Sequence, residues 1–157
     1  AGRIKDNTST WYTTNDATLE ITGVQLEVGS HATDFEHRSY AQELALCQRY
    51  YYVYMPTSRY LANLGIGAYT GNGVQFELSI RYPSMRATPS LVQTTGTDYF
   101  AVYVHNNVTE YFDSFSTDQL KQESTGLITS NAGSHGGKAG RCRINNNSAS
   151  IAFSAEL

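Results

Sequence analysis

Charged residues and cysteines are both scarce in this 157-residue chain. Charged side chains make up 16% of the sequence, whereas an average globular protein has roughly 25%. The formal net charge of −3 argues against an extended basic surface for duplex nucleic acid or an anionic membrane, although it leaves room for a local basic patch. Two cysteines exclude a disulfide-rich scaffold. Cys47 and Cys142 could form one bridge, but two buried thiols are the interpretation that we favour.

Motifs for catalysis and cofactor binding are also missing. The four histidines show no paired ligand spacing, so no metal is predicted. No serine-nucleophile motif and no phosphate-binding motif occurs, and we therefore predict no cofactor and no enzymatic activity. The glycine-rich residues 133–138 are interpreted as a flexible surface loop, because no strand-then-helix frame surrounds them. No apolar run approaches the roughly 18 residues of a membrane span, so no membrane insertion is predicted.

Two pairs of neighbouring acids leave one enzymatic alternative open. Glycosidases use two carboxyl groups roughly 5–10 Å apart. Glu110 lies close to Asp113 in the sequence, and Asp34 lies close to Glu36. With 14 acidic residues in the chain, such neighbours are expected by chance, so a polysaccharide depolymerase is the weakest of our functional hypotheses.

The N-terminal third combines one strand pattern with one helix pattern. Apolar and polar residues alternate over residues 19–28, with a change of face at Gly23, which predicts a strand with a bulge. Such a strand needs partners from later strands, from another chain or from residues before position 1. Ser39 and Gln42 form a capping-box pattern that predicts a helix over residues 40–49. Residues 50–54 contain four tyrosines and predict a strand that packs on a core and on a helix or partner subunit.

The remaining residues predict antiparallel β structure. Residues 74–82 alternate without interruption and follow the turn signal Asn72-Gly73. An edge strand is predicted over 90–94, a hairpin over 99–105 and 108–112, and a closing hairpin over 141–144 and 149–157. Residues 120–130 are ambiguous. Roughly eight strands with turns every 8–12 residues favour an antiparallel sandwich or jelly roll.

The predicted fold is therefore all-β, with an antiparallel β-sandwich or jelly-roll-like C-terminal domain preceded by an N-terminal strand and one short helix. We place the end of a preceding β domain, or an N-terminal strand, at residues 1–30, a helix–strand linker at 31–56 and the C-terminal domain at 57–157. Because the sequence begins with Ala rather than Met, we interpret it as a fragment, a processed product or the ordered part of a longer chain.

The sequence contains more residues that suit ligand binding than residues that suit catalysis. Aromatic rings pack on the apolar face of a sugar, and short polar side chains read its hydroxyl groups. Such sites sit on loops held by a rigid scaffold. The candidate glycan- or receptor-binding residues combine these two features and are Tyr69, Asn72, His105, Asn106, Asn107, Tyr111, Asp113 and His135. The alternative is that the tyrosines fill the core or a subunit interface.

Residues 21–52, ITGVQLEVGSHATDFEHRSYAQELALCQRYYY, resemble a pattern in the tails and tail fibres of bacteriophages and prophages. There, a carbohydrate-binding-module-like jelly roll precedes a C-terminal β domain. Residues 84–89, SMRATP, and the ending ASIAFSAEL are also similar to this family. Asp34 departs from it, since the family often has proline there. The loops of the C-terminal half are not covered by the resemblance.

The resemblance implies a virion protein at the distal part of a tail fibre. Such fibres are usually homotrimers that join other tail proteins and bind host surface polysaccharide or an outer-membrane receptor. Aromatic residues on both faces of residues 50–54 and 99–104 are also typical of an oligomer interface. A purely structural trimerisation or assembly module is the main alternative. No receptor-contacting residue is transferred from the family, because no motif identifies one.

Overall fold

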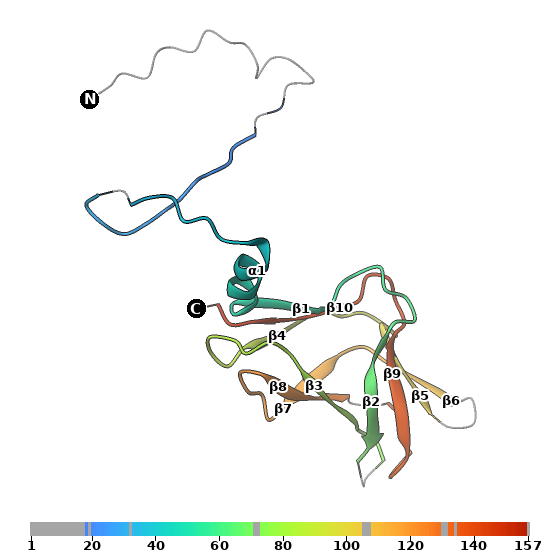
Figure 1. The fold of residues 1–157 in the computed structure, drawn as a ribbon. Coiled ribbons are helices and arrows are strands. Elements are labelled where there is room, and N and C mark those ends of the chain that lie inside the picture. The colour runs from blue at the N-terminus through green and yellow to red at the C-terminus, as the bar shows by residue number, and fades with distance from the viewer. Residues whose placement is uncertain are drawn as a thin grey trace. The chain divides into compact units, whose positions relative to one another are not determined.

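The computed structural model describes residues 18, 20–31, 33–70, 73–104, 108–129, 132–133 and 135–156. The chain divides into two compact units, Ala1–Arg38 and Ser39–Leu157, and each is described by itself. The second unit contains the helix and all the strands of the described residues (Figure 1). Residues 39–56, which belong to the helix–strand linker predicted at 31–56, lie within this unit.

The first unit has no strand among its described residues, so residues 20–28 do not form the predicted strand with the later strands of this chain. Leu26 is 99% exposed, and Ile21 and Val24 are also largely exposed. The alternating pattern is present, but no described strand pairs with it. A strand needs partner strands, because they provide hydrogen bonds for its backbone N–H and C=O groups and bury its apolar face.

Side-chain hydrogen bonds instead hold a turn in this unit. The backbone N–H of Thr33 donates to Glu27 Oε1 at 2.6 Å, and the Thr33 hydroxyl donates to Oε2 of the same carboxylate. The N–H of Glu36 donates to Gln25 Oε1 at 2.9 Å. The hydrogen bonds from the Thr33 side chain and backbone lower the pKa of the exposed Glu27 carboxyl.

The helix α1, Tyr40–Gln48, confirms the predicted capping box. The N–H of Gln42 donates to the Ser39 hydroxyl, and the N–H of Ser39 donates to Gln42 Oε1. No residue of α1 is buried, and Tyr40 is 82% exposed. The apolar residues Tyr40 and Leu44 of this helix are therefore exposed.

Ten strands of the described residues form two antiparallel sheets, which confirms the all-β prediction. The smaller sheet has the order β1-β10-β4, from β1 (Tyr51–Met55), β10 (Ser150–Ser154) and β4 (Ser90–Thr94). The larger sheet curls on itself (Figure 1) and has the order β6-β5-β9-β2-β3-β8-β7. Its strands are β2 (Asn63–Tyr69), β3 (Phe76–Arg81), β5 (Phe100–Val104), β6 (Val108–Phe112), β7 (Phe115–Asp118), β8 (Ser124–Thr129) and β9 (Ala139–Ile144).

Most strand predictions are confirmed, including β3, the edge strand β4 and the β5–β6 hairpin. The predicted closing hairpin is wrong, because β9 pairs with β2 and β5 whereas β10 pairs with β1 and β4. Ile144 of β9 and Ile151 of β10 are both fully buried. Each of the two strands therefore contributes buried side chains to the core from a different sheet. The strand β7 is not predicted, because its four residues are too few to show a clear alternation.

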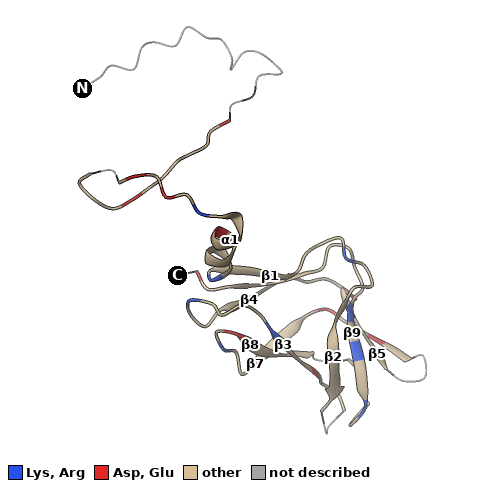
Figure 2. Ribbon diagram, viewed as in Figure 1, with Lys and Arg blue, Asp and Glu red and all other residues tan. Residues whose placement is uncertain are grey.

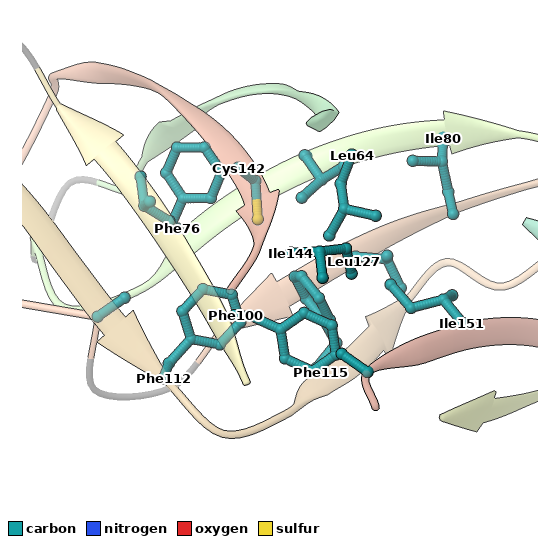
Figure 3. Packing of buried hydrophobic residues seen from close by; sticks show 14 of the residues in the cluster. Leu64, Phe76, Ile80, Phe100, Phe112, Phe115, Leu127, Cys142, Ile144 and Ile151 are labelled. Atoms are coloured by element: carbon teal, nitrogen blue, oxygen red, sulfur yellow. The ribbon is translucent and has the colours of Figure 1, made fainter. Parts of the chain in front are cut away.

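Aromatic and aliphatic side chains of both sheets share one core (Figure 3). Phe100, Phe112 and Phe115 meet within it, with ring centroids 4.9–5.6 Å apart. Tyr82, just after β3, stacks on Phe153 of β10 at 4.3 Å and so joins the two sheets. This packing leaves the loops of the larger sheet on a rigid support.

Both cysteines are free thiols. Cys142 is completely buried, and this burial strongly raises the pKa of its thiol. Cys47 lies on α1 and is exposed, so the interpretation of two buried thiols is correct for Cys142 and wrong for Cys47. Cys47 thus shares the exposure of the whole helix, which has no buried residue.

Candidate functional site

Three connections of the larger sheet join strand ends that lie at one end of it, which we call the loop end. They are residues 70–75 between β2 and β3, 105–107 between β5 and β6, and 130–138 between β8 and β9. The strand register brings them together, because Tyr69 pairs with Phe76, Val104 pairs with Val108, and Gly140 pairs with both Gly67 and Val104. Asn72, His105, Asn106 and Asn107 belong to these connections but lie outside the described residues.

Tyr69, Glu110 and His135 form a polar cluster at the loop end. His135 Nε2 lies 2.8 Å from Glu110 Oε1, and both side chains are less than one-third exposed. The ring of Tyr69 contacts the His135 ring edge-on, with centroids 5.3 Å apart. The alternation of β6 explains the position of Glu110, because it shares the inner face with the buried Phe112. The structure thus brings together two of the predicted binding residues and one acid of the predicted carboxylate pair.

Tyr69 is fixed by its own hydroxyl group. Its Oη donates to the carbonyl of Ala132 at 2.5 Å, and the ring also packs edge-on against Phe76. Burial raises the pKa of Tyr69 to about 12, and the nearby Glu110 carboxylate adds to this shift. The phenol is therefore a neutral anchor of the β8–β9 connection, and only 3% of the residue is exposed.

Backbone hydrogen bonds tie the β8–β9 connection to the β2–β3 turn. The N–H of His135 donates to Gly73 O at 2.9 Å, and the N–H of Tyr69 donates to Lys138 O at 2.9 Å. Gly73 has φ +79°, and a Cβ there would lie 2.8 Å from the backbone nitrogen of Gly136. The segment predicted to be a flexible surface loop is thus anchored on both sides of His135. The lack of a side chain at Gly73 allows the two backbones to approach this closely.

Tyr111 and Asp113, the two other predicted binding residues that the structure describes, lie away from this cluster. Tyr111 is 46% exposed on the outer face of β6. Asp113 follows the opposite end of β6 and accepts a hydrogen bond from the N–H of Asp98 at 2.9 Å. Glu110 and Asp113 therefore bind different partners, and the structure assigns no shared proton chemistry to them. Among the described residues, no group of three acids, histidines or cysteines could hold a metal ion.

A second group of polar residues, which the sequence did not lead us to predict, lies on the outer face of the larger sheet. Arg141 and Arg143 both lie over the ring of Tyr103, with their guanidinium carbons 5.7 Å from its centroid. The pattern Arg-Cys-Arg, with Cys142 inside, would have predicted both arginines on one outer face. Figure 2 shows basic residues along β9.

Comparisons with protein-family models, curated proteins and solved structures find no match for this chain. In the described part of the chain, the single helix is too short to cross a membrane.

Proposed function

We propose that this chain is the distal part of a phage tail fibre and that its loop end binds a glycan or receptor on the host surface. The observation that carries the proposal is the cluster of Tyr69, Glu110 and His135, which a rigid β support holds at the loop end. The resemblance of residues 21–52 to phage tail proteins supports the biological setting.

The chemistry of the cluster suits binding rather than catalysis. Glu110 engages His135 through one carboxylate oxygen, and the second oxygen can accept a hydrogen bond from a sugar hydroxyl. Glu110 and His135 are partly exposed, so a ligand can reach them, while Tyr69 holds the connection in place. A charge-assisted hydrogen bond contributes about 1.5–3 kcal/mol, which is enough to make these side chains important for affinity.

A glycan array of bacterial surface polysaccharides, probed with the whole chain, tests this proposal. We expect binding to a subset of the polysaccharides, and a loss of about tenfold or more in affinity for Glu110→Gln and for His135→Ala. His31→Ala is the matched control, because His31 is exposed and lies in the first unit. The proposal is wrong if the chain binds no polysaccharide or if both variants bind like the wild type.

A structural role in trimer assembly is the second candidate, and exposed apolar residues favour it. They belong to α1 and to the following turn and strand: Tyr40, Leu44, Tyr50, Tyr51 and Val53. Oligomer interfaces of this kind resemble a core divided in two. A homotrimer would also strengthen weak glycan binding by joining three loop ends in one particle.

Sedimentation at micromolar concentration tests the trimer separately. We expect three times the chain mass of 17.3 kDa, and a monomer for Leu44→Asp and Val53→Asp. Ile66→Asp is the control, because Ile66 is 77% exposed but lies on β2. A monomeric wild type contradicts the trimer, whereas a trimer that binds no polysaccharide supports the assembly module.

A further inference from the structure

The outer face of the larger sheet carries an arginine–tyrosine face, which we define as Tyr103, Tyr111, Arg141 and Arg143. The strand register places these residues side by side, because Tyr103 is opposite Arg141, and Ala101 is opposite both Arg143 and Tyr111. Ala101 lies beneath them and is completely buried. The four larger side chains therefore form one continuous layer over β5, β6 and β9.

The two arginines of this face have no acidic partner in the described part of the chain, where no carboxylate lies within ion-pair distance of either. Arg143 Nε is buried and makes no hydrogen bond there. The nearby acid on the same outer face, Glu77 of β3, is directed toward Gly126 of β8, where its Oε1 lies 3.1 Å from the position of an added Cβ. The face is thus a local basic patch on an acidic protein, and an anionic ligand would complement it.

The rings supply a second contact of a different kind. Tyr111 is 46% exposed, so one face or edge of its ring is open to a ligand. Tyr103 holds both guanidinium groups at a distance at which cation–π attraction acts. This attraction limits the motion of the arginines and leaves their planar N–H groups to pair with an oxyanion.

We propose that the arginine–tyrosine face binds an acidic polysaccharide. Successive acidic groups of the polymer pair with Arg141 and Arg143, and a sugar ring between or beside them packs on Tyr111. Carboxylate and phosphate groups both suit the guanidinium fork, so the shared chemistry is an oxyanion attached to a sugar polymer. Two arginines are too few for duplex DNA, whose protein partners make roughly 6–10 phosphate contacts.

This face is distinct from the loop end and does not require the loop end to bind a glycan. Glu110 lies on the inner face of β6, whereas Tyr111 lies on its outer face. Binding at one site can therefore be present when binding at the other is absent.

Calorimetric titration of the full chain with four probes tests the proposal. The probes are an oligogalacturonate, a poly(glycerol phosphate), a neutral malto-oligosaccharide of matched length and a single-stranded oligonucleotide. We expect one or both of the first two to bind, with affinity that falls as salt is raised, and the neutral sugar not to bind here. Comparison of the oligogalacturonate with the poly(glycerol phosphate) shows whether the face prefers carboxylate or phosphate groups.

Variants then assign the binding to residues. Arg141→Gln and Tyr111→Ala should each weaken binding of the acidic probe about tenfold. Arg81→Gln is the matched control, because Arg81 is an exposed arginine on the outer face of β3, in the same sheet. Arg141 is chosen before Arg143 because its exposed side chain can be replaced without disturbing the fold.

Three results would overturn the proposal. One is that the wild type binds neither acidic probe at millimolar concentration. Another is that Arg141→Gln and Arg81→Gln weaken binding equally, which would indicate a general charge effect. The third is that the oligonucleotide binds more tightly than either acidic polymer, which would assign the face to nucleic acid.

Discussion

The loop end of the larger sheet exposes polar side chains, whereas α1 and the neighbouring strand β1 of the smaller sheet, which we call the helical end, expose apolar ones. At the loop end, polar side chains are fixed by specific partners, such as Tyr69 by Ala132 and His135 by Glu110. At the helical end, α1 has no buried residue, and Tyr51 and Val53 of β1 are nearly half exposed. A fixed polar surface suits recognition of a ligand, whereas an uncovered apolar one suits association with another chain.

The largest expected effect compares a core aromatic residue with an exposed one on the helix. Phe100→Ala should lower the free energy of unfolding by about 3–5 kcal/mol, because the fully buried ring contacts Phe112 and Phe115. Tyr40→Ala should change it by less than about 0.5 kcal/mol in a monomer. Urea unfolding measures both. Equal losses would mean that α1 is packed into the domain.

A smaller effect is expected for the glycines of the loop end. Gly133→Ala should cost about 2–3 kcal/mol, because Gly133 has φ +74° and the new Cβ would lie 2.5 Å from Glu110 Cδ. Gly137→Ala is the control: its φ is +72°, but a Cβ there meets nothing within 4 Å, so about 1 kcal/mol is expected. Thermal unfolding compares them. Equal costs would show that Glu110 is free to move aside.

The next prediction concerns Tyr69. Tyr69→Phe should cost about 1–2 kcal/mol at neutral pH, because the buried carbonyl of Ala132 loses its donor. The pKa of Tyr69 is raised to about 12, so the folded state keeps a proton that the unfolded state releases above about pH 10. The stability of the wild type should therefore fall as the pH rises from about 10 to 12.

Urea unfolding at about pH 9 and at about pH 11 measures this dependence. Tyr54 and Tyr82, whose pKa values are also raised by burial, will leave a residual slope in the Tyr69→Phe variant. The variant should nevertheless lose less stability than the wild type over this interval. An identical slope in both proteins would mean that Tyr69 ionises freely.

The smallest effect is expected at the helix cap. Ser39→Ala removes the hydroxyl that accepts from the N–H of Gln42 and should destabilise α1 by about 0.5–1 kcal/mol. Because α1 buries no residue, the helix should fray while the sheets keep their stability. Amide hydrogen exchange resolves the two regions. Faster exchange in β3 as well would mean that the helix supports the core.

Local patterns were sufficient to predict much of this protein. The alternation over residues 74–82 identified β3, and Phe76, Leu78, Ile80 and Tyr82 are buried as that pattern requires, although Val74 is not. The pair Ser39 and Gln42 located the start of the helix. Tyr69 and His135 were recognised as binding candidates because aromatic and polar residues flanked predicted turns. Each of these inferences depends on neighbours only a few residues apart.

Long-range packing decided the rest. Alternation predicts that a strand has a buried face but not which strand pairs with it, so β9 and β10 were joined in one hairpin although they belong to different sheets. The same limit applies to residues 19–28, whose pattern is strand-like but which have no partner among the described strands. The contact of Glu110 with His135, 25 residues later, and that of two arginines with Tyr103, exist only because the sheet register places them together. The sequence determined which faces are apolar, and tertiary structure determined what those faces meet, because pairing and closure depend on residues far apart in the chain.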